Sequence, residues 1–250
     1  MNQPTPLVTA PSPKSFFKSG REDSPFKRIM IHITLIFFCI LALYPVLRVF
    51  SVSLRPGDRL LSTDLSIIPA DASLDAYRIV LVEKPFLQWI WNSLAITVST
   101  AVIGVILAAT SAYAFSRFKF PGRSVGLTFL LTTQMIPATM LLVPLYILAV
   151  QLGLVGTYRG LVIAFAVTAV PFSIWILKGY YDTVPIDLEE AARIDGCSPL
   201  EAFWRILLPL STPALAIVFL FNFTTAWNDY LLSRVILAEK EALLTWPLGL

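Results

Sequence analysis

The sequence predicts an all-α membrane protein that crosses the bilayer several times. Of its 250 residues, 56% are hydrophobic and only 14% are charged, which is more apolar surface than a soluble domain of this size could bury. Apolar stretches without formal charge recur along the chain, and most are long enough to cross the hydrocarbon core. Clusters of Lys and Arg lie between some of these stretches, as the positive-inside rule describes for cytoplasmic loops.

Several classes of function are excluded by what the sequence lacks. The net charge of +3 is small and scattered, so we expect no nucleic-acid partner. His32 is the single histidine, which leaves no His-based metal pattern, and no Gly-x-Ser-x-Gly elbow occurs. Cys39 and Cys197 are read as two isolated thiols. We therefore predict no catalytic residues, no metal and no cofactor, and we expect that the chain is not an enzyme.

The chain is expected to begin with a disordered cytoplasmic tail over residues 1–25, rich in proline and polar residues. The first membrane span is predicted at residues 29–47, which carry no formal charge. Lys27 and Arg28 precede it, so the N-terminus is placed in the cytoplasm.

Four further spans are predicted, and alternation places residues 117–123 and 178–208 in the cytoplasm and residues 51–84 and 229–241 outside. The cations Arg117, Lys119 and Arg123 support this assignment. The apolar residues 242–250 are too few for another span. The four spans are residues 85–116, residues 124–150 with kinks at Pro137 and Pro144, residues 160–177 with a break at Pro171, and residues from about 209 to 227 with Pro213 in the first turns.

The polar insert at 185–209 carries start and stop signals for two short helices. Pro185 and the acidic residues after it favour a helix to about Ile194, and Gly196 is suited to end it. Ser198, Pro199 and Glu201 form a capping box that starts a second helix, which we expect to reach about Leu208. The insert should therefore be a compact knob on the cytoplasmic face, suited to a groove in a partner.

The knob also contains a known motif in full. Its residues Glu190, Ala191, Ala192, Gly196, Ile206, Leu208 and Pro209 reproduce the spacing EAA-x3-G-x9-I-x-LP. In this the sequence resembles the permease subunits of binding-protein-dependent ABC importers. The segments 113–123, 134–146, 170–185 and 221–231 are similar to the smaller permease of maltose-type sugar importers. Residues 26–250 would then form one transmembrane domain, with the coupling loop at 185–209.

This resemblance implies a type I permease fold in the inner membrane, in which the seven motif residues couple the chain to an ATPase. Glu190 would be the charged contact, Ala191 and Ala192 the close-packing face, and Gly196 the turn. The implied partners are a second permease, two ATP-binding subunits that hold the ATP, an external solute-binding protein and a small sugar. Such permeases have six spans and a cytoplasmic C-terminus, so the five predicted here imply that the sixth is missing from this sequence.

Neutral polar side chains in the spans are the candidates for a substrate path, and we single out Gln134, Asn222 and Asn228. An unpaired amide in hydrocarbon costs several kcal/mol, so each should face a helix or water. Contacts between helices would explain them as well as a sugar path does.

Two alternatives to a sugar importer stay open. The motif describes the ATPase and not the cargo, so the solute could be a polyol, a peptide or a phosphate ester. The chain could also be a membrane interaction protein without a transport role, with a knob that binds something other than an ATPase.

Overall fold

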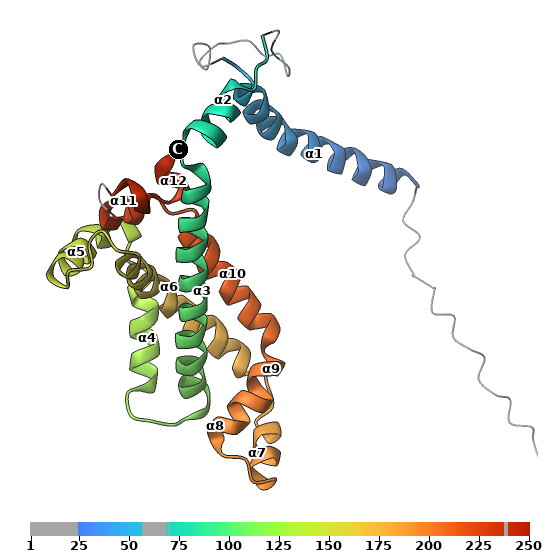
Figure 1. Cartoon of the computed structure of the whole chain (residues 1–250). Coiled ribbons are helices and arrows are strands. Elements are labelled where there is room, and N and C mark those ends of the chain that lie inside the picture. Colours follow the sequence, from blue (N-terminus) through green and yellow to red (C-terminus); the bar gives the residue numbers. More distant parts are fainter. Residues whose placement is uncertain (1–24, 57–68, 70, 238–239) are drawn as a thin grey trace, which may run out of the picture. The chain divides into compact units, whose positions relative to one another are not determined.

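The computed structural model describes residues 25–56, 69, 71–237 and 240–250, and every regular element in them is helical (Figure 1). These residues form two compact units, one up to Tyr77 and one from Arg78 onward. The disordered tail is predicted for residues 1–25. Helix α1 begins at Pro25, and the rest of the predicted tail lies outside the described residues.

The first unit is dominated by helix α1 (Pro25–Ser53), which has 29 residues. At 1.5 Å per residue it is about 44 Å long, enough to cross the bilayer. The predicted first span is confirmed, with additional turns at both ends. Its large apolar side chains are exposed throughout. Helix α2 (Asp75–Arg78) and the π-helical turn η2 (Ile79–Glu83) follow further along the chain.

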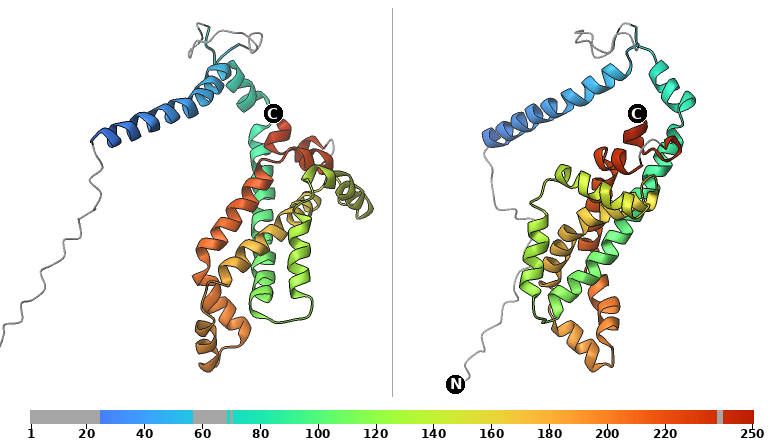
Figure 2. Two further views of the ribbon diagram at one scale, coloured as in Figure 1. Left: turned by 180° about the vertical axis from the view of Figure 1, so that it is seen from behind. Right: turned by 90° about the vertical axis from the view of Figure 1, so that its left-hand side faces the viewer.

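The second unit is built around three long helices, α3 (Phe86–Arg117), α6 (Tyr158–Tyr181) and α10 (Thr212–Trp227), which pack against one another (Figures 1 and 2). The buried face of α3 carries small residues, among them Ala101, Gly104 and Ala108. Small residues allow membrane helices to approach closely. At Gly104 an added Cβ would lie 2.6 Å from the amide nitrogen of Asn222 on α10.

The third predicted span is not one kinked helix. It consists of α4 (Arg123–Thr133) and α5 (Ala138–Gln151), which meet at an angle of 102°. With 11 and 14 residues, neither helix alone crosses a hydrocarbon core of about 30 Å. The break occurs at Pro137, whose ψ of 132° is extended; a residue before proline also avoids the helical region. Pro144, by contrast, lies inside α5 without ending it.

The fourth span is confirmed, but the break predicted at Pro171 is wrong. Helix α6 continues through Pro171 to Tyr181, because a single missing hydrogen bond is tolerated where neighbouring helices support the backbone. At its start, the side chain of Thr157 accepts a hydrogen bond of 3.1 Å from the Gly160 amide.

The fifth span begins later than predicted. A bend of 78° separates residues Pro199–Leu210 from α10, and Pro213 lies in the first turn of α10. Among the described residues, three helices are long and apolar enough to cross a membrane, or five segments if each bent pair is one span.

The chain ends in short helices: α11 (Leu231–Leu237), the 3-10 turn η4 (Glu241–Leu243) and α12 (Trp246–Gly249). They fold onto the start of α3. The Asn92 amide donates to the carbonyls of Ala242 and Leu244 at 3.0 and 2.9 Å, and the Trp246 amide donates to the Ser93 hydroxyl at 2.9 Å. Residues 242–250 are therefore an ordered part of the second unit.

Candidate functional site

The knob (residues 185–209) lies at the end of the second unit opposite α11 and α12 (Figures 1 and 2). It contains α7 (Asp187–Ile194), α8 (Pro199–Ala202), the π-helical turn η3 (Phe203–Leu207) and the start of α9 (Leu208–Leu210). The prediction of two short helices that meet at Gly196 is confirmed, although the first begins at Asp187 rather than at Pro185.

The turn between the helices depends on the left-handed backbone of Gly196, whose φ is 96°. The Cys197 amide donates to the Ala192 carbonyl at 2.9 Å and the Gly196 amide to the Arg193 carbonyl at 3.1 Å. These two bonds form a Schellman motif, which satisfies the last carbonyls of α7. No atom lies within 4 Å of an added Cβ at Gly196, so glycine is required here for conformation and not for space.

The second helix starts with the predicted capping box. The Ser198 amide donates to Oε2 of Glu201 at 2.8 Å, and the Glu201 amide donates to the Ser198 hydroxyl at 3.3 Å. Hydrogen bonds from the backbone and the side chain of Ser198 to the Glu201 carboxylate hold the pKa of Glu201 below its ordinary value. The fold of the knob is thus set largely by its own sequence.

A buried ion pair attaches the knob to α3. Nε of Arg117 lies 2.6 Å from Oε1 of Glu189, and the two side chains are only 10% and 7% exposed. The Tyr113 hydroxyl lies 3.2 Å from Oε2 of Glu189 and 3.0 Å from the Pro199 carbonyl oxygen. Nη2 of Arg117 also donates to the Val184 carbonyl at 3.0 Å. One turn of α3 therefore holds both helices of the knob.

A second polar attachment joins α3 to the end of α6. The Ser116 hydroxyl donates to Oδ1 of Asp182 at 2.7 Å, and Lys178 pairs with Oδ2 of the same carboxylate. Burial acts to raise the pKa of Asp182, but the hydrogen bonds from Lys178 and Ser116 outweigh it and hold that pKa below its ordinary value. The chain entering the knob is thus fixed just before α7 begins.

Apolar packing completes the attachment. Ala192, Ala202, Phe203 and Leu207 are buried, and the rings of Phe203 and Tyr113 have centroids 4.7 Å apart. Of the two motif alanines, Ala192 therefore packs in the interior of this chain, whereas its neighbour Ala191 is exposed.

The exposed face of the knob includes large apolar side chains. Ile194 and Leu200 are 87% and 64% exposed, and they flank the turn at Gly196. Glu190, Ala191 and Gly196 are also exposed. The remaining motif residues lie where the knob bends toward α10: Ile206 and Leu208 are half-buried and Pro209 is exposed.

Sequence reasoning missed the residues that hold the knob, namely Tyr113, Arg117 and Glu189. Tyr113 and Arg117 are four residues apart and so share one face of α3, and Glu189 precedes the motif glutamate. The ion pair joins positions 72 residues apart, and no local pattern predicts such a contact.

The three candidates for a substrate path do not lie together. Asn222 is fully buried between α3, α6 and α10, where its Oδ1 accepts a 2.9 Å bond from the Ser173 hydroxyl. Asn228 is exposed and donates to the Thr224 carbonyl of its own helix. Gln134 is exposed at the break between α4 and α5 and donates to the Thr168 carbonyl at 3.2 Å. Gln134 also lines a cavity between the end of α4, the start of α5 and the middle of α6.

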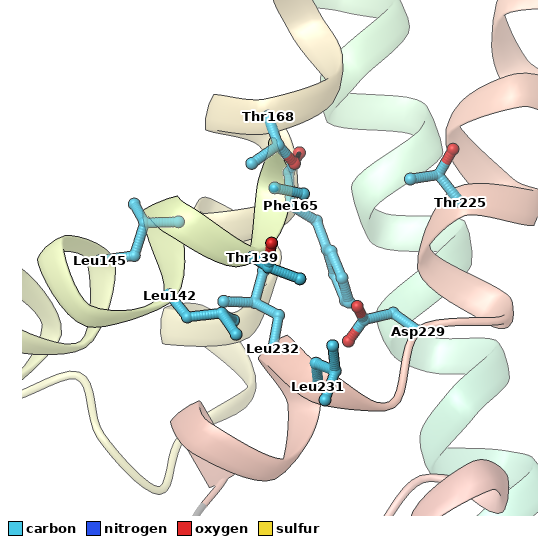
Figure 3. A pocket seen from close by; sticks show the side chains of 10 residues that line it. Thr139, Leu142, Leu145, Phe165, Thr168, Thr225, Asp229, Leu231 and Leu232 are labelled. Carbon is cyan, nitrogen blue, oxygen red and sulfur yellow. Dashed lines mark hydrogen bonds between the residues drawn. The ribbon is translucent and has the colours of Figure 1, made fainter. Parts of the chain in front are cut away.

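Three threonines and one carboxylate lie among the mostly apolar residues that line a small cavity beside this break (Figure 3). Thr139 belongs to α5, Thr168 to α6 and Thr225 to α10, and Asp229 follows α10. Oδ1 of Asp229 accepts bonds of 2.9 and 3.1 Å from the Ser233 amide and hydroxyl. Burial raises the pKa of Asp229. Within the described part of the chain, no cluster of three or more metal-ligating side chains is found.

Comparison with known proteins gives a consistent result. Residues 100–248 match the family described as binding-protein-dependent transport system inner membrane component. The chain is 37% identical to the galactooligosaccharides transport system permease protein GanQ of Bacillus subtilis, over 88% of this chain and 77% of that protein. It is 35% identical to the maltose/maltodextrin transport system permease protein MalG of Salmonella typhimurium, over 88% and 80%. The trehalose transport system permease protein SugB of Mycobacterium tuberculosis is 36% identical, over 81% and 73%.

A solved structure supports the same fold. The chain resembles a chain in the crystal structure of a bacterial ABC transporter involved in the import of the acidic polysaccharide alginate, with a TM-score of 0.75 and 31% identity. The match covers 88% of this chain and 79% of the other.

Proposed function

The chain belongs to the family of binding-protein-dependent transport system inner membrane components, and we propose that it is the smaller permease of an ATP-driven sugar importer. It would pair with a second permease, and the knobs of the two permeases would bind two copies of an ATP-hydrolysing subunit. The sugar would come from an external binding protein. The N-terminus and the knob would lie in the cytoplasm.

The observation that carries this proposal is the knob itself. It presents an exposed apolar face beside Glu190, and buried contacts fix it to α3. In the proposed cycle, closure of the ATPase subunits displaces the knob. Because a buried ion pair resists separation, α3 follows the displacement, and the path opens alternately to the two sides.

The motif residues take distinct roles in this cycle. Glu190 is the charged contact to the ATPase, Ala191 allows close packing, and Gly196 shapes the turn. Ala192 supports α7 from inside. Ile206, Leu208 and Pro209 join the knob to α10.

A sugar is favoured over other solutes because three permeases that are 35–37% identical are named for galactooligosaccharides, maltose and trehalose. A polyol, a peptide or a phosphate ester is the second candidate cargo. Uptake of labelled sugars by the assembled transporter, in competition with members of each class, separates these candidates.

Two substitutions test the docking role. Glu190→Lys reverses the charge of the proposed contact, and Gly196→Asp places a side chain at a φ of 96°, a strain of about 1–3 kcal/mol. Both variants should insert into the membrane and lose the ATPase from the purified complex.

Matched controls are available in the same unit. Gly122→Asp imposes a similar strain at a φ of 85° outside the knob, and Glu241→Lys reverses an exposed charge in η4. Both controls should retain the ATPase. Normal co-purification and sugar uptake in Glu190→Lys and Gly196→Asp would contradict the docking role.

A further inference from the structure

The break between α4 and α5 creates two adjacent cavities in the second unit. The larger, of about 550 Å³, lies between the end of α4, the start of α5 and the middle of α6. The smaller, of about 100 Å³, lies between α5, α6 and the region that follows α10. Ala138 and Thr168 line both. The larger volume is within the range of about 300–1,000 Å³ typical of ligand pockets, whereas the smaller can hold only part of a ligand.

The polar groups at these cavities are almost all uncharged. Thr133 and Gln134 line the larger cavity, and Thr139, Thr168 and Thr225 line the smaller. The side-chain nitrogen of Gln134 donates to the Thr168 carbonyl. The side-chain oxygen of Gln134 can still accept a hydrogen bond. Mostly apolar walls with a few placed polar groups are the usual composition of a small-molecule site.

Among the described residues, Asp229 is the single charged one that lines either cavity. Hydrogen bonds from Ser233 and Leu232 act on its carboxylate, and no cation in the described part of the chain contributes to its pKa. A carboxylate has about four acceptor positions, and these donors do not use all of them. Figure 3 shows the carboxylate beside the ring of Phe165. Such a group favours a hydroxyl donor and disfavours an anion.

We propose that these cavities form a subsite of the transport path for a neutral, hydroxyl-rich sugar. One sugar ring occupies the larger cavity, where the side-chain oxygen of Gln134 accepts a hydrogen bond from a sugar hydroxyl. A hydroxyl or hydroxymethyl group of the sugar enters the smaller cavity and donates a hydrogen bond to the carboxylate of Asp229. This subsite rests on the proposed function and adds to it a class of cargo: neutral glycans, with uronic acids rejected by the carboxylate.

The first experiment measures sugar import and ATP hydrolysis together in proteoliposomes that contain the complete transporter. Labelled maltose, trehalose and galactobiose are the probes. Asp229→Asn retains the shape of the side chain and an acceptor for Ser233, but it removes the charge. We expect about a tenfold fall in import, because hydrogen bonds to charged groups are the strong ones, while ATP hydrolysis stimulated by the loaded binding protein changes less than twofold.

Ser233→Ala is the matched control for a purely structural role of Asp229. It removes the hydroxyl that donates a hydrogen bond to Asp229 but leaves the carboxylate in the cavity. Sugar import should therefore stay near the wild-type rate. Equal import by Asp229→Asn and wild type overturns the subsite. So does an equal loss in Ser233→Ala, or a parallel loss of ATP hydrolysis in Asp229→Asn.

The second experiment detects occupancy directly and needs no transport. In a Cys39→Ser, Cys197→Ser background, Thr139→Cys is alkylated in the detergent-purified transporter with and without each sugar. We expect at least one neutral sugar to slow alkylation about fivefold and a uronic-acid disaccharide to leave it unchanged. Val125→Cys, at the exposed start of α4, should be labelled at one rate throughout.

The two arms separate the subsite from the function on which it rests. A wild-type transporter that imports none of the three sugars refutes the proposed sugar import. If the wild type imports a sugar but the thiol introduced at position 139 is not protected, or is protected equally by the uronic acid, the subsite is wrong and the proposed function stands. Protection by detergent or lipid alone would show that an acyl chain occupies the cavity, and it would also overturn the subsite.

Discussion

Neutralising Glu189 should release the knob from α3 while leaving the bundle folded. Glu189→Gln keeps the side-chain volume but removes the charge that faces Nε of Arg117 at 2.6 Å and the acceptor pair shared with Tyr113. A hydrogen bond to a charged group contributes about 1.5–3 kcal/mol. The substituted amide would still offer one oxygen, and Arg117 keeps the Val184 carbonyl, so we expect a loss of about 2 kcal/mol. That loss corresponds to about a 30-fold increase in local opening.

Limited trypsin cleavage after Arg193 measures this opening, because α7 must unfold locally before it can be cut. In the purified permease pair, Glu189→Gln should be cleaved about 30 times faster than wild type. Asp187→Asn removes an exposed charge from the first turn of α7. Losing its interaction with the helix dipole costs about 0.3–1 kcal/mol, so the rate should rise no more than about fivefold. A double-mutant cycle with Arg117→Gln should give a coupling energy of at least about 1 kcal/mol. Additive effects, or cleavage of Glu189→Gln at the wild-type rate, would refute the attachment.

Two further predictions concern the end of α6 and the helix packing. The folded-state pKa of Asp182 is lowered, so the stability that its carboxylate contributes is present above the unfolded pKa of about 3.8 and is lost as the pH falls through the folded pKa. Wild type should therefore resist pepsin better than Asp182→Asn at pH 5, and this difference in cleavage rate should disappear by pH 2. A difference that stays constant over this range would contradict the prediction. Gly104→Ala places a Cβ 2.6 Å from Asn222, and this overpacking should cost about 1–3 kcal/mol of stability. The unfolding temperature in detergent should fall, and the double variant Gly104→Ala, Asn222→Ala should partly restore it. An unchanged unfolding temperature in the single variant would contradict the close approach of the two helices.

The helical spans and the fold of the knob could be predicted from the sequence because their signals are local. Charge-free stretches of sufficient length identify spans, and the capping box at Ser198 and the glycine at 196 define the knob within a dozen residues. Each of these features depends on neighbours in the chain and needs no knowledge of tertiary packing.

Prolines could not be interpreted in the same way. Pro137 is the residue before α5 at a break between helices, whereas Pro144 lies inside α5 and Pro171 inside α6. The effect of a lost hydrogen bond depends on what the surrounding helices provide. The role of Asn222 was equally hidden: a polar residue in a span can face a path or another helix, and only the packing of α3 against α10 places it inside the bundle.

Site-specific cross-linking tests the central claim, that the knob binds the ATP-hydrolysing subunit, most directly. Cysteine is introduced at Ala191, or at Leu248 at the opposite end of the second unit, in a chain without Cys39 and Cys197. The assembled transporter is then treated with a short thiol-to-amine reagent. We expect a covalent adduct with the ATPase subunit from position 191 and none from position 248. An adduct from position 248, or no adduct from position 191 in a transporter that hydrolyses ATP, would contradict it.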